Sequence, residues 1–212
     1  VILKENFVDQ KTAYFNEYVK NNTDAPFLIK LEKDANGNYS AGKVLRASEI
    51  EALKHTENAE WKTCIFDTLS AAPVVPNGTL GNRWQKEKGS WNLRNQDSIT
   101  GKAIEPLLSV FDSKDEIVML SVSDFSNSQN DQNLLRQIPA KKINTVNGEI
   151  LVATGLDLLL AQYGVSQKLS GEYPSDYSND SLFTPAWQEK FTGCSQEAVI
   201  KFAREWAKTA EL

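Results

Sequence analysis

The chain has 212 residues, which is enough for one large domain or two small ones with a hydrophobic core. Its 41% hydrophobic and 24% charged residues are ordinary for a globular protein, and its formal net charge of -5 disfavours nucleic acid as a partner, since proteins that bind polyanions carry a basic face. No stretch approaches the roughly 18 apolar residues of a transmembrane helix, so we expect no direct membrane insertion.

The first predicted element is an amphipathic helix over residues 9–20, with Asp9 as its N-cap. Its expected buried face consists of Ala13, Tyr14, Phe15, Tyr18 and Val19. A β-hairpin follows, with strands over 27–33 and 39–45, because Asn36-Gly37 between them suits a tight turn. Residues 47–55 then predict a short helix with Ser48 near its start, and residues 61–69 predict another strand.

Residues 70–108 form the least regular stretch, because prolines and glycines interrupt any long element there. Trp84 and Trp91 nevertheless lie within it, and each ring has about 150–250 Å2 of surface to bury. We therefore expect the two rings to pin this loop to the core. The alternative is that the loop faces a bound cofactor or another domain.

The second half of the chain predicts a strand, a polar loop, a second hairpin, a compact apolar helix and a polar linker. In chain order these elements occupy residues 115–122, 123–133, 134–154, 155–164 and 165–182. Asn147-Gly148 marks the hairpin turn, and Gly164 can close the helix in the left-handed conformation. Arg136, Lys141 and Lys142 form a small basic spot, which we interpret as a strand edge protected against pairing.

Two helices are predicted at the C-terminus. Thr184 caps the first, with Pro185 at its first position and Gly193 at its end, and Ser195 caps the second. The apolar residues of the second helix share one broad face, on which we expect the pair to pack against a core: Val199, Ile200, Phe202, Ala203, Trp206, Ala207 and Ala210. Hairpins and short strands with flanking helices and this C-terminal helical pair predict an α+β fold.

The sequence offers few residues for metal or nucleophilic chemistry. Its cysteines, Cys64 and Cys194, form no C-x-x-C pair, and its one histidine, His55, lies in a polar stretch. We therefore expect no zinc or iron–sulfur site and no catalytic triad from this chain alone. Gly78-x-x-Gly81 lacks the ending of a phosphate-binding loop, and the acidic residues 112–116 lack the spacing of a calcium loop.

A family resemblance rests on blocks of sequence that follow one another in a fixed order. They are "YFNEYVKNNTDAPFLIKLEKDANGNYSAGKVLRASEIEAL", "WKTCIFDT" with "PNGTLGNRWQKEKGSWNL", "IPAKKINTVNGEILVATGLDLLLAQYGV" and "FTPAWQEKFTGCSQEAVIKFAREWA". Together they resemble the catalytic alpha subunit of membrane-bound respiratory nitrate reductases, which are molybdopterin oxidoreductases. The last block alone would indicate only the wider molybdopterin group.

This resemblance implies a parent subunit that reduces nitrate to nitrite in anaerobic respiration. Such a subunit carries a molybdenum bis(molybdopterin guanine dinucleotide) cofactor and a [4Fe-4S] cluster. Its partners are an iron–sulfur beta subunit and a membrane subunit that oxidises quinol, at the cytoplasmic face of the cell membrane. The chain opens on Val1 and its only methionine is Met119, so we expect residues 1–212 to be a single internal domain, folded but catalytically inactive and without bound cofactor in isolation.

The family's iron–sulfur ligands and its molybdenum-ligating aspartate map to no position of this chain, neither Asp67 nor Asp157 included. No catalytic or metal-ligating residue is therefore predicted. If a surface faces the cofactor, the candidate binding residues are Asn77, Arg83, Trp84 and Trp91, because arginine and amide groups suit phosphates and pterin edges. Two alternatives remain open: another oxidoreductase of the same lineage, acting on selenate, chlorate or dimethyl sulfide, and a non-catalytic interaction module.

Overall fold

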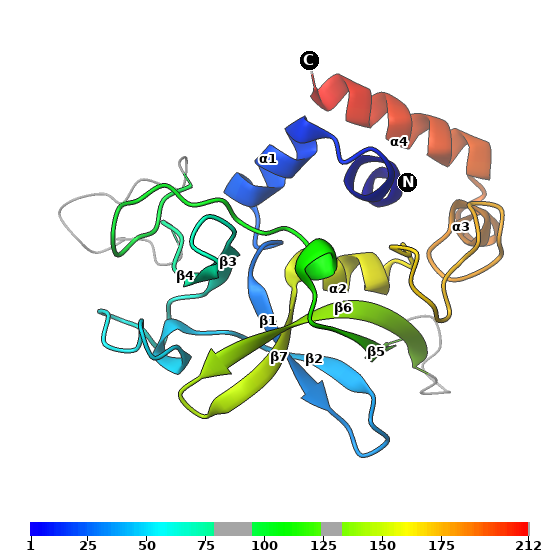
Figure 1. Cartoon of the computed structure of the whole chain (residues 1–212). Coiled ribbons are helices and arrows are strands. Elements are labelled where there is room, and N and C mark those ends of the chain that lie inside the picture. Colours follow the sequence, from blue (N-terminus) through cyan, green and yellow to red (C-terminus); the bar gives the residue numbers. More distant parts are fainter. Residues whose placement is uncertain (79–94, 124–132, 212) are drawn as a thin grey trace.

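The computed structural model describes residues 1–78, 95–123 and 133–211. Its centre is a closed five-stranded barrel, shown in the lower half of Figure 1. The strands, in their order around the barrel, are β1 (Leu28–Lys33), β2 (Tyr39–Val44), β5 (Glu116–Val122), β6 (Leu134–Thr145) and β7 (Gly148–Thr154). All neighbouring pairs are antiparallel except β2 and β5, which meet in parallel at Tyr39 and Leu120. The predicted α+β class is confirmed.

Both predicted hairpins are present. β1 pairs with β2, β6 pairs with β7, and the glycines at the two turns, Gly37 and Gly148, have φ of 87° and 111°. Only glycine adopts such angles without strain, which explains why the turns were readable from the sequence. The barrel interior is filled by apolar side chains that alternate along the strands, among them Leu31, Val118, Leu120, Ile138 and Ala153.

A small hairpin of β3 (Ile65–Asp67) and β4 (Ala72–Val74) lies beside the barrel. The predicted strand over 61–69 is therefore too long, because the Asp67 carboxylate accepts hydrogen bonds from the amides of Leu69 and Ser70 and turns the chain. The predicted helix over 47–55 is reduced to a 3-10 turn at Ala47–Glu49. The amides of Ala47 and Ser48 bond to the distant carbonyls of Lys62 and Ala59.

The N-terminus forms two helices, not one. A π-helix spans Leu3–Asp9, and α1 spans Ala13–Asn22 with Thr12 at its N-cap position. The prediction of Asp9 as a cap was wrong, since Asp9 is the last residue of the first helix. Lys11, with a φ of 51°, then separates that helix from α1. The predicted buried face was also wrong: no residue of α1, all of which is described, is buried, and Tyr14 and Tyr18 are 42% and 52% exposed.

Helix α2 (Gly155–Gln162) confirms the predicted apolar helix, and Gly164 follows it with a φ of 70°. The helix packs against β6 and β7 of the barrel. Its N-terminus is capped reciprocally by Thr154 and Asp157. Residues 165–182 run alongside without helix or strand, although Gly171 forms a bridge with Arg136 of β6. The predicted linker stretch is thus attached to the barrel.

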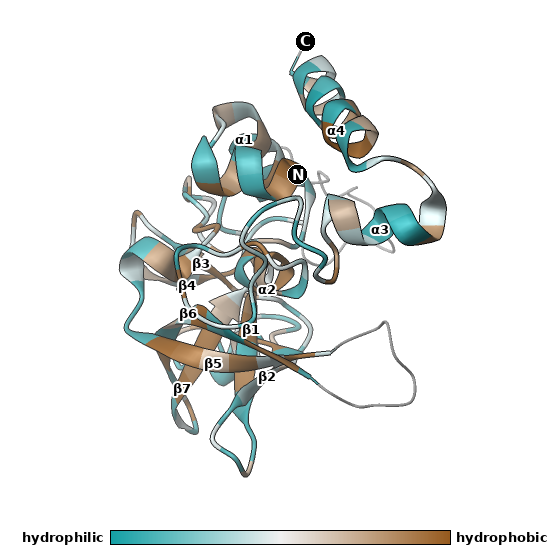
Figure 2. Cartoon of the chain, turned by 90° about the vertical axis from the view of Figure 1, so that its right-hand side faces the viewer, coloured by the Kyte–Doolittle hydropathy of each residue, from teal (hydrophilic) through white to brown (hydrophobic). Residues whose placement is uncertain are grey.

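The C-terminal helices are α3 (Pro185–Thr192) and α4 (Gln196–Ala210). Their predicted caps are confirmed, because the hydroxyls of Thr184 and Ser195 accept the expected amides and Gly193 has a φ of 74°. The predicted packing of α4 on a core was wrong, since within this fully described helix only Ala207 is buried. Figures 1 and 2 show α4 on the side of the N-terminal helices that is remote from the barrel.

Candidate functional site

Asn77 lies at the base of the tryptophan-bearing loop. Its amide donates to the carbonyl of Gln96 at 2.9 Å, and its side-chain Nδ2 lies 3.4 Å from Gln96 Oε1. Pro76 and Asp97 form an adjacent bridge, so the two ends of the stretch 79–94 are held side by side. Arg83, Trp84 and Trp91 lie outside the described residues. Among the predicted binding residues the structure therefore places Asn77 alone.

Asp67 and Asp97 build two matching turns around this loop base. Each carboxylate accepts hydrogen bonds from two backbone amides and from a hydroxyl three residues ahead, Ser70 Oγ or Thr100 Oγ1, at 2.6 Å. Asp67 also accepts the amide of Glu105 at 2.7 Å. Burial pushes the pKa of Asp67 upward, but the hydrogen bonds from Ser70 and the backbone together lower it. Both carboxylates are committed to holding turns.

Asp157 is a third buried carboxylate, only 1% exposed, and it is surrounded by donors. Ser109 Oγ lies 2.5 Å from Oδ1, the amide of Val110 lies 3.0 Å from Oδ2, and Gln167 Nε2 lies 3.0 Å from Oδ1. Burial raises the pKa of Asp157, against the opposing effect of these hydrogen bonds. The group joins α2, the 3-10 turn at Val110–Ser113 and the stretch 165–182, which is a structural task.

The described residues do not assemble a metal centre. None of them forms a group of three or more histidines, cysteines, aspartates or glutamates that could hold an ion. Cys64 is buried, and burial raises the pKa of its thiol to about 12, so the free thiol stays protonated at neutral pH. Two carboxylates of the acidic stretch 112–116 have partners elsewhere in the fold. Asp112 forms an ion pair with Lys11, and Asp115 accepts a hydrogen bond from the amide of Lys142.

Arg136 is the buried charge that sequence reasoning misplaced. It was interpreted as part of a protected strand edge, but β6 lies between β5 and β7, and the side chain is 1% exposed. Its Nε donates to the carbonyl of Glu172 at 2.8 Å, and its Nη1 donates to those of Ala161 and Gln162 at 2.5 and 3.1 Å. The alternation of side chains along β6 could have indicated this burial, because Arg136 lies on the same face of the strand as the buried Ile138.

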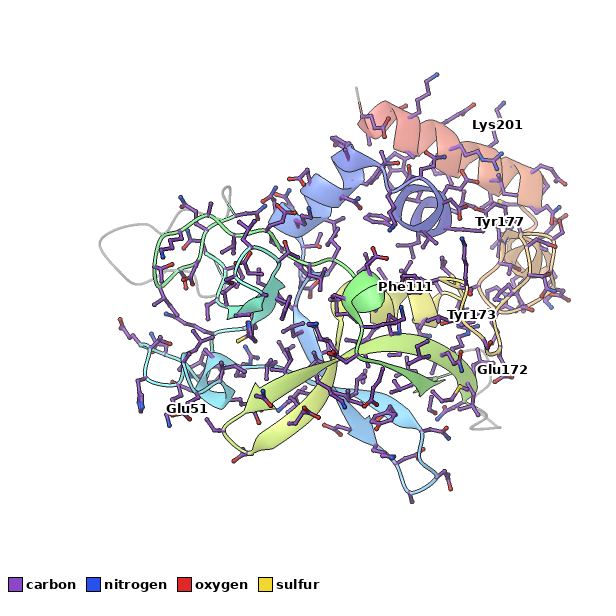
Figure 3. All side chains as sticks on the ribbon, in the orientation of Figure 1. Glu51, Phe111, Glu172, Tyr173, Tyr177 and Lys201 are labelled. Carbon is purple, nitrogen blue, oxygen red and sulfur yellow. The ribbon has the colours of Figure 1, made fainter. Side chains whose placement is uncertain are left out.

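The surroundings of Arg136 explain its role. The guanidinium lies 5.4 Å from the ring centroid of Tyr173, whose hydroxyl donates to the carbonyl of Gln137 at 2.8 Å. Burial lowers the pKa of Arg136 and raises that of Tyr173 to about 12. Figure 3 shows Glu172 and Tyr173 beside the barrel. A cation here satisfies the C-terminal carbonyls of α2 and fixes the stretch 165–182 to β6.

An apolar groove lies between α1 and α4. It encloses about 310 Å3, and the residues that line it are Ile2, Tyr14, Phe15, Tyr18, Trp206, Ala207 and Ala210. Next to this groove, Arg204 of α4 donates to both carboxylate oxygens of Glu5, which also accepts the hydroxyl of Tyr177 at 3.1 Å. Every helix among the described residues is too short or too polar to cross a membrane.

Known proteins with similar sequences identify the family. No family model matches the chain. The nitrate reductase alpha chain of Bacillus subtilis is 42% identical over 210 residues, which are 99% of this chain and 17% of that protein. The respiratory nitrate reductase 1 alpha chain of Escherichia coli is 38% identical over 222 residues, 100% of this chain and 18% of its own length. The nitrate reductase alpha subunit of Mycobacterium tuberculosis is 37% identical over 214 residues, 99% of this chain and 17% of its own length.

The chain thus spans less than a fifth of the length of these relatives, while they match it from end to end. The similarity confirms the resemblance seen in the sequence blocks. The chain is homologous to the alpha chains of respiratory nitrate reductases and is a fragment of such a subunit.

Proposed function

We propose that the chain is one domain of a catalytic subunit that reduces nitrate to nitrite at a molybdenum bis(molybdopterin guanine dinucleotide) centre in anaerobic respiration. The observation that supports this proposal is the similarity over the whole chain to nitrate reductase alpha chains of several bacteria. Electrons would reach the centre through a [4Fe-4S] cluster and an iron–sulfur beta subunit, from a membrane subunit that oxidises quinol. The complex would lie at the cytoplasmic face of the membrane.

The part that this domain plays is structural support. The described residues do not fit a molybdenum or iron–sulfur ligand set, because they contain no suitable group of histidine, cysteine or acidic side chains. The buried carboxylates Asp67, Asp97 and Asp157 are occupied by donors from their own surroundings. We derive no chemical step from them. The metal ligands of the parent subunit would come from other parts of its polypeptide.

The loop that starts after Asn77 is the part that we propose to approach the cofactor. Its base is fixed by the Asn77–Gln96 pairing and by the Asp97 turn, which hold the described residues on its two sides together. Arg83 within that loop carries the planar guanidinium that binds phosphate oxygens in pairs.

The first experiment tests the function of the whole subunit. The parent alpha subunit, expressed anaerobically, is assayed for molybdenum and iron content and for nitrate reduction with reduced viologen as the electron donor. We expect both metals and nitrate-dependent oxidation of viologen. A metal-loaded subunit that ignores nitrate but reduces selenate or chlorate would assign the domain to another enzyme of the lineage. A subunit without molybdenum would contradict the proposal and favour an interaction module.

The second experiment tests the loop. Arg83→Ala in the whole subunit is expected to lower molybdopterin content, and activity in proportion to it, because a phosphate contact is lost. Lys102→Ala is the matched control, since Lys102 is an exposed cation near the loop base whose side chain makes no hydrogen bond within the described residues. Cofactor content and activity that stay unchanged in Arg83→Ala would remove the loop from the cofactor site.

A further inference from the structure

We propose that the apolar groove between α1 and α4, together with Phe202 of α4 beside it, is covered by another part of the same alpha-chain polypeptide, which packs there through an apolar segment. The groove plays no part in nitrate chemistry, so the inference goes beyond the proposed function. It requires only that the chain is a fragment of a longer subunit, as its similarity to the relatives shows.

The first observation is the uncovered stripe of α4. The sequence of this helix places its apolar residues on one face, yet Phe202 and Trp206 are 64% and 61% exposed. Their ring centroids lie 5.7 Å apart, so they form one continuous aromatic surface. Lys201 lies on the outer side of the helix, where its side chain is 75% exposed and points away from the rest of the chain in Figure 3.

The second observation is that α1 presents a matching surface. Tyr14 and Tyr18 are stacked with centroids 6.4 Å apart, and both are more than one-third exposed. Phe15 and Ile2 continue this surface into the groove, which Trp206 closes from the side of α4. Two helices from opposite ends of the chain therefore turn aromatic side chains toward the same hollow.

The third observation concerns what holds α4 in place. Its contacts with the N-terminal helix include the polar Arg204–Glu5 ion pair, whose carboxylate also accepts the hydroxyl of Tyr177. A 15-residue helix gains most of its stability from packing of its apolar face, and here the two largest side chains of that face, Phe202 and Trp206, are exposed. The described residues thus leave this aromatic part of the stripe without a covering partner.

The chemistry and the chain length identify the occupant. The residues that line the groove include no charged side chain, so they suit an apolar or aromatic segment, with the tyrosine hydroxyls available at the rim. More than four-fifths of the related alpha chains lies outside the part that matches this chain. Covalent linkage gives that remainder a high effective concentration, which favours it over a separate molecule.

The test is hydroxyl-radical footprinting of the purified whole alpha chain, with oxidation measured for each residue by peptide mass spectrometry. Phe66, which is 9% exposed within the core, is the internal reference for a buried phenylalanine. We expect Phe202 to be oxidised as slowly as Phe66 in the monomeric alpha chain without other subunits, and Trp206 to be protected in the same sample. The measurement needs neither nitrate nor electron donors, so its outcome is independent of the proposed activity.

Three results would overturn the inference. Rapid oxidation of Phe202 and Trp206 in both the alpha chain and the full complex would show that the face stays open. Protection that appears only when another subunit is added would assign the groove to that subunit. Protection that depends on alpha-chain concentration would assign it to a second copy.

A set of substitutions in the whole alpha chain adds a second measurement. Phe202→Asp and Trp206→Asp are expected to lower its thermal unfolding midpoint, because each places a charge in the proposed contact. Lys201→Asp introduces the same residue into the same helix on the exposed side, and we expect it to leave the midpoint nearly unchanged. Equal effects of all three would contradict the proposal, and footprinting of the unsubstituted protein remains decisive if a variant does not accumulate.

Discussion

Arg136 shows how one side chain can join three parts of the chain. It reaches from β6 to the last carbonyls of α2 and to the carbonyl of Glu172, while its guanidinium stacks near Tyr173. Buried cations without a direct carboxylate partner are costly to desolvate, so these carbonyl contacts and the C-terminal end of the α2 dipole must offset that cost. The residue is a structural clamp between the barrel and the stretch 165–182.

This clamp predicts a large effect for Arg136→Met, which keeps an extended side chain but removes every donor. We expect the free energy of unfolding of the 212-residue chain to fall by about 3 kcal/mol, since each buried carbonyl left without a partner costs about 1–3 kcal/mol. The measurement is urea unfolding followed by circular dichroism. Lys142→Met on the same strand is the control, because Lys142 is exposed and its ion pairs with Glu116 and Glu149 contribute little. Similar midpoints for the two variants would contradict the clamp.

The loop-base residues show where sequence reasoning about the site stops. The amide side chain of Asn77 makes it a candidate binding residue. Its pairing with Gln96, nineteen positions away, depends instead on the tertiary fold that brings residues 77 and 96 together. Asp67 and Asp157 could not be assigned from sequence, because their roles come from donors such as Glu105 and Ser109 that are distant in the chain. Local residue types predict that a carboxylate can bind or cap, but only the tertiary fold determines which donor it meets.

At the scale of elements, turns and caps were predictable and burial was not. Gly37, Gly148 and Gly193 take the left-handed angles expected of them, because a steric rule within a few residues decides the outcome. Helices α1 and α4 follow their predicted periodicity but leave large aromatic side chains of their apolar faces exposed, namely Tyr14, Tyr18, Phe202 and Trp206. Periodicity specifies which residues share a face, and it says nothing about whether the covering partner belongs to the same stretch of chain.

Gly171 and Gly193 both have positive φ, and substituting each with alanine separates the cost of backbone strain from the cost of steric crowding. A Cβ added at Gly193 meets nothing within 4 Å, whereas one added at Gly171 lies 2.6 Å from the carbonyl oxygen of Leu135 and 2.7 Å from Cα of Arg136. We expect Gly193→Ala to cost about 1–2 kcal/mol from left-handed strain alone. Gly171→Ala should cost a further 1–3 kcal/mol or so from overpacking against β6. Equal losses in chemical denaturation would show that residues 165–182 do not press on the barrel.

The ion pair between the N-terminal helix and α4 predicts a pH dependence. The hydrogen bonds from Arg204, followed by that from Tyr177, lower the pKa of Glu5 below its usual value despite partial burial. A depressed carboxyl pKa in the folded state stabilises the fold above the unfolded pKa of about 4.3, and this contribution is lost as the pH falls through the folded pKa. The pair should therefore tie α4 to the N-terminus at neutral pH.

We expect the melting temperature of Glu5→Gln to lie below that of the unsubstituted 212-residue chain at pH 7. The difference should shrink as the pH is lowered from about 4.3 toward 3, where Glu5 itself becomes protonated. Glu51→Gln is the control, because the Glu51 side chain is 75% exposed and, among the described residues, pairs with Lys54 of its own turn. A gap between Glu5→Gln and the unsubstituted chain that stays constant from pH 7 to pH 3 would contradict this account.

For the whole molecule, the hairpins and helix caps seen in the sequence predicted the α+β class. They did not predict that the strands close into a barrel. The β2–β5 contact rests on the single pair of Tyr39 and Leu120, which are far apart in sequence and carry no local signal of their pairing. The closed barrel gives its strands neighbours on both sides, whereas α4 is held by polar contacts and by α3. Stability should therefore be uneven across the 212-residue chain.

This unevenness predicts the pattern of hydrogen exchange. In the 212-residue chain we expect the amides of α4 to exchange much faster than those of β6 and β7, because local opening of α4 exposes little additional apolar surface. In the whole alpha chain the protection of α4 should rise toward that of the barrel, if the rest of the polypeptide covers Phe202 and Trp206. Peptide-resolved exchange on both proteins measures this difference, with the barrel strands as the internal control. Protection of α4 equal to that of β6 in the 212-residue chain would mean that the polar contacts alone hold the helix, and the exposed stripe would then need another explanation.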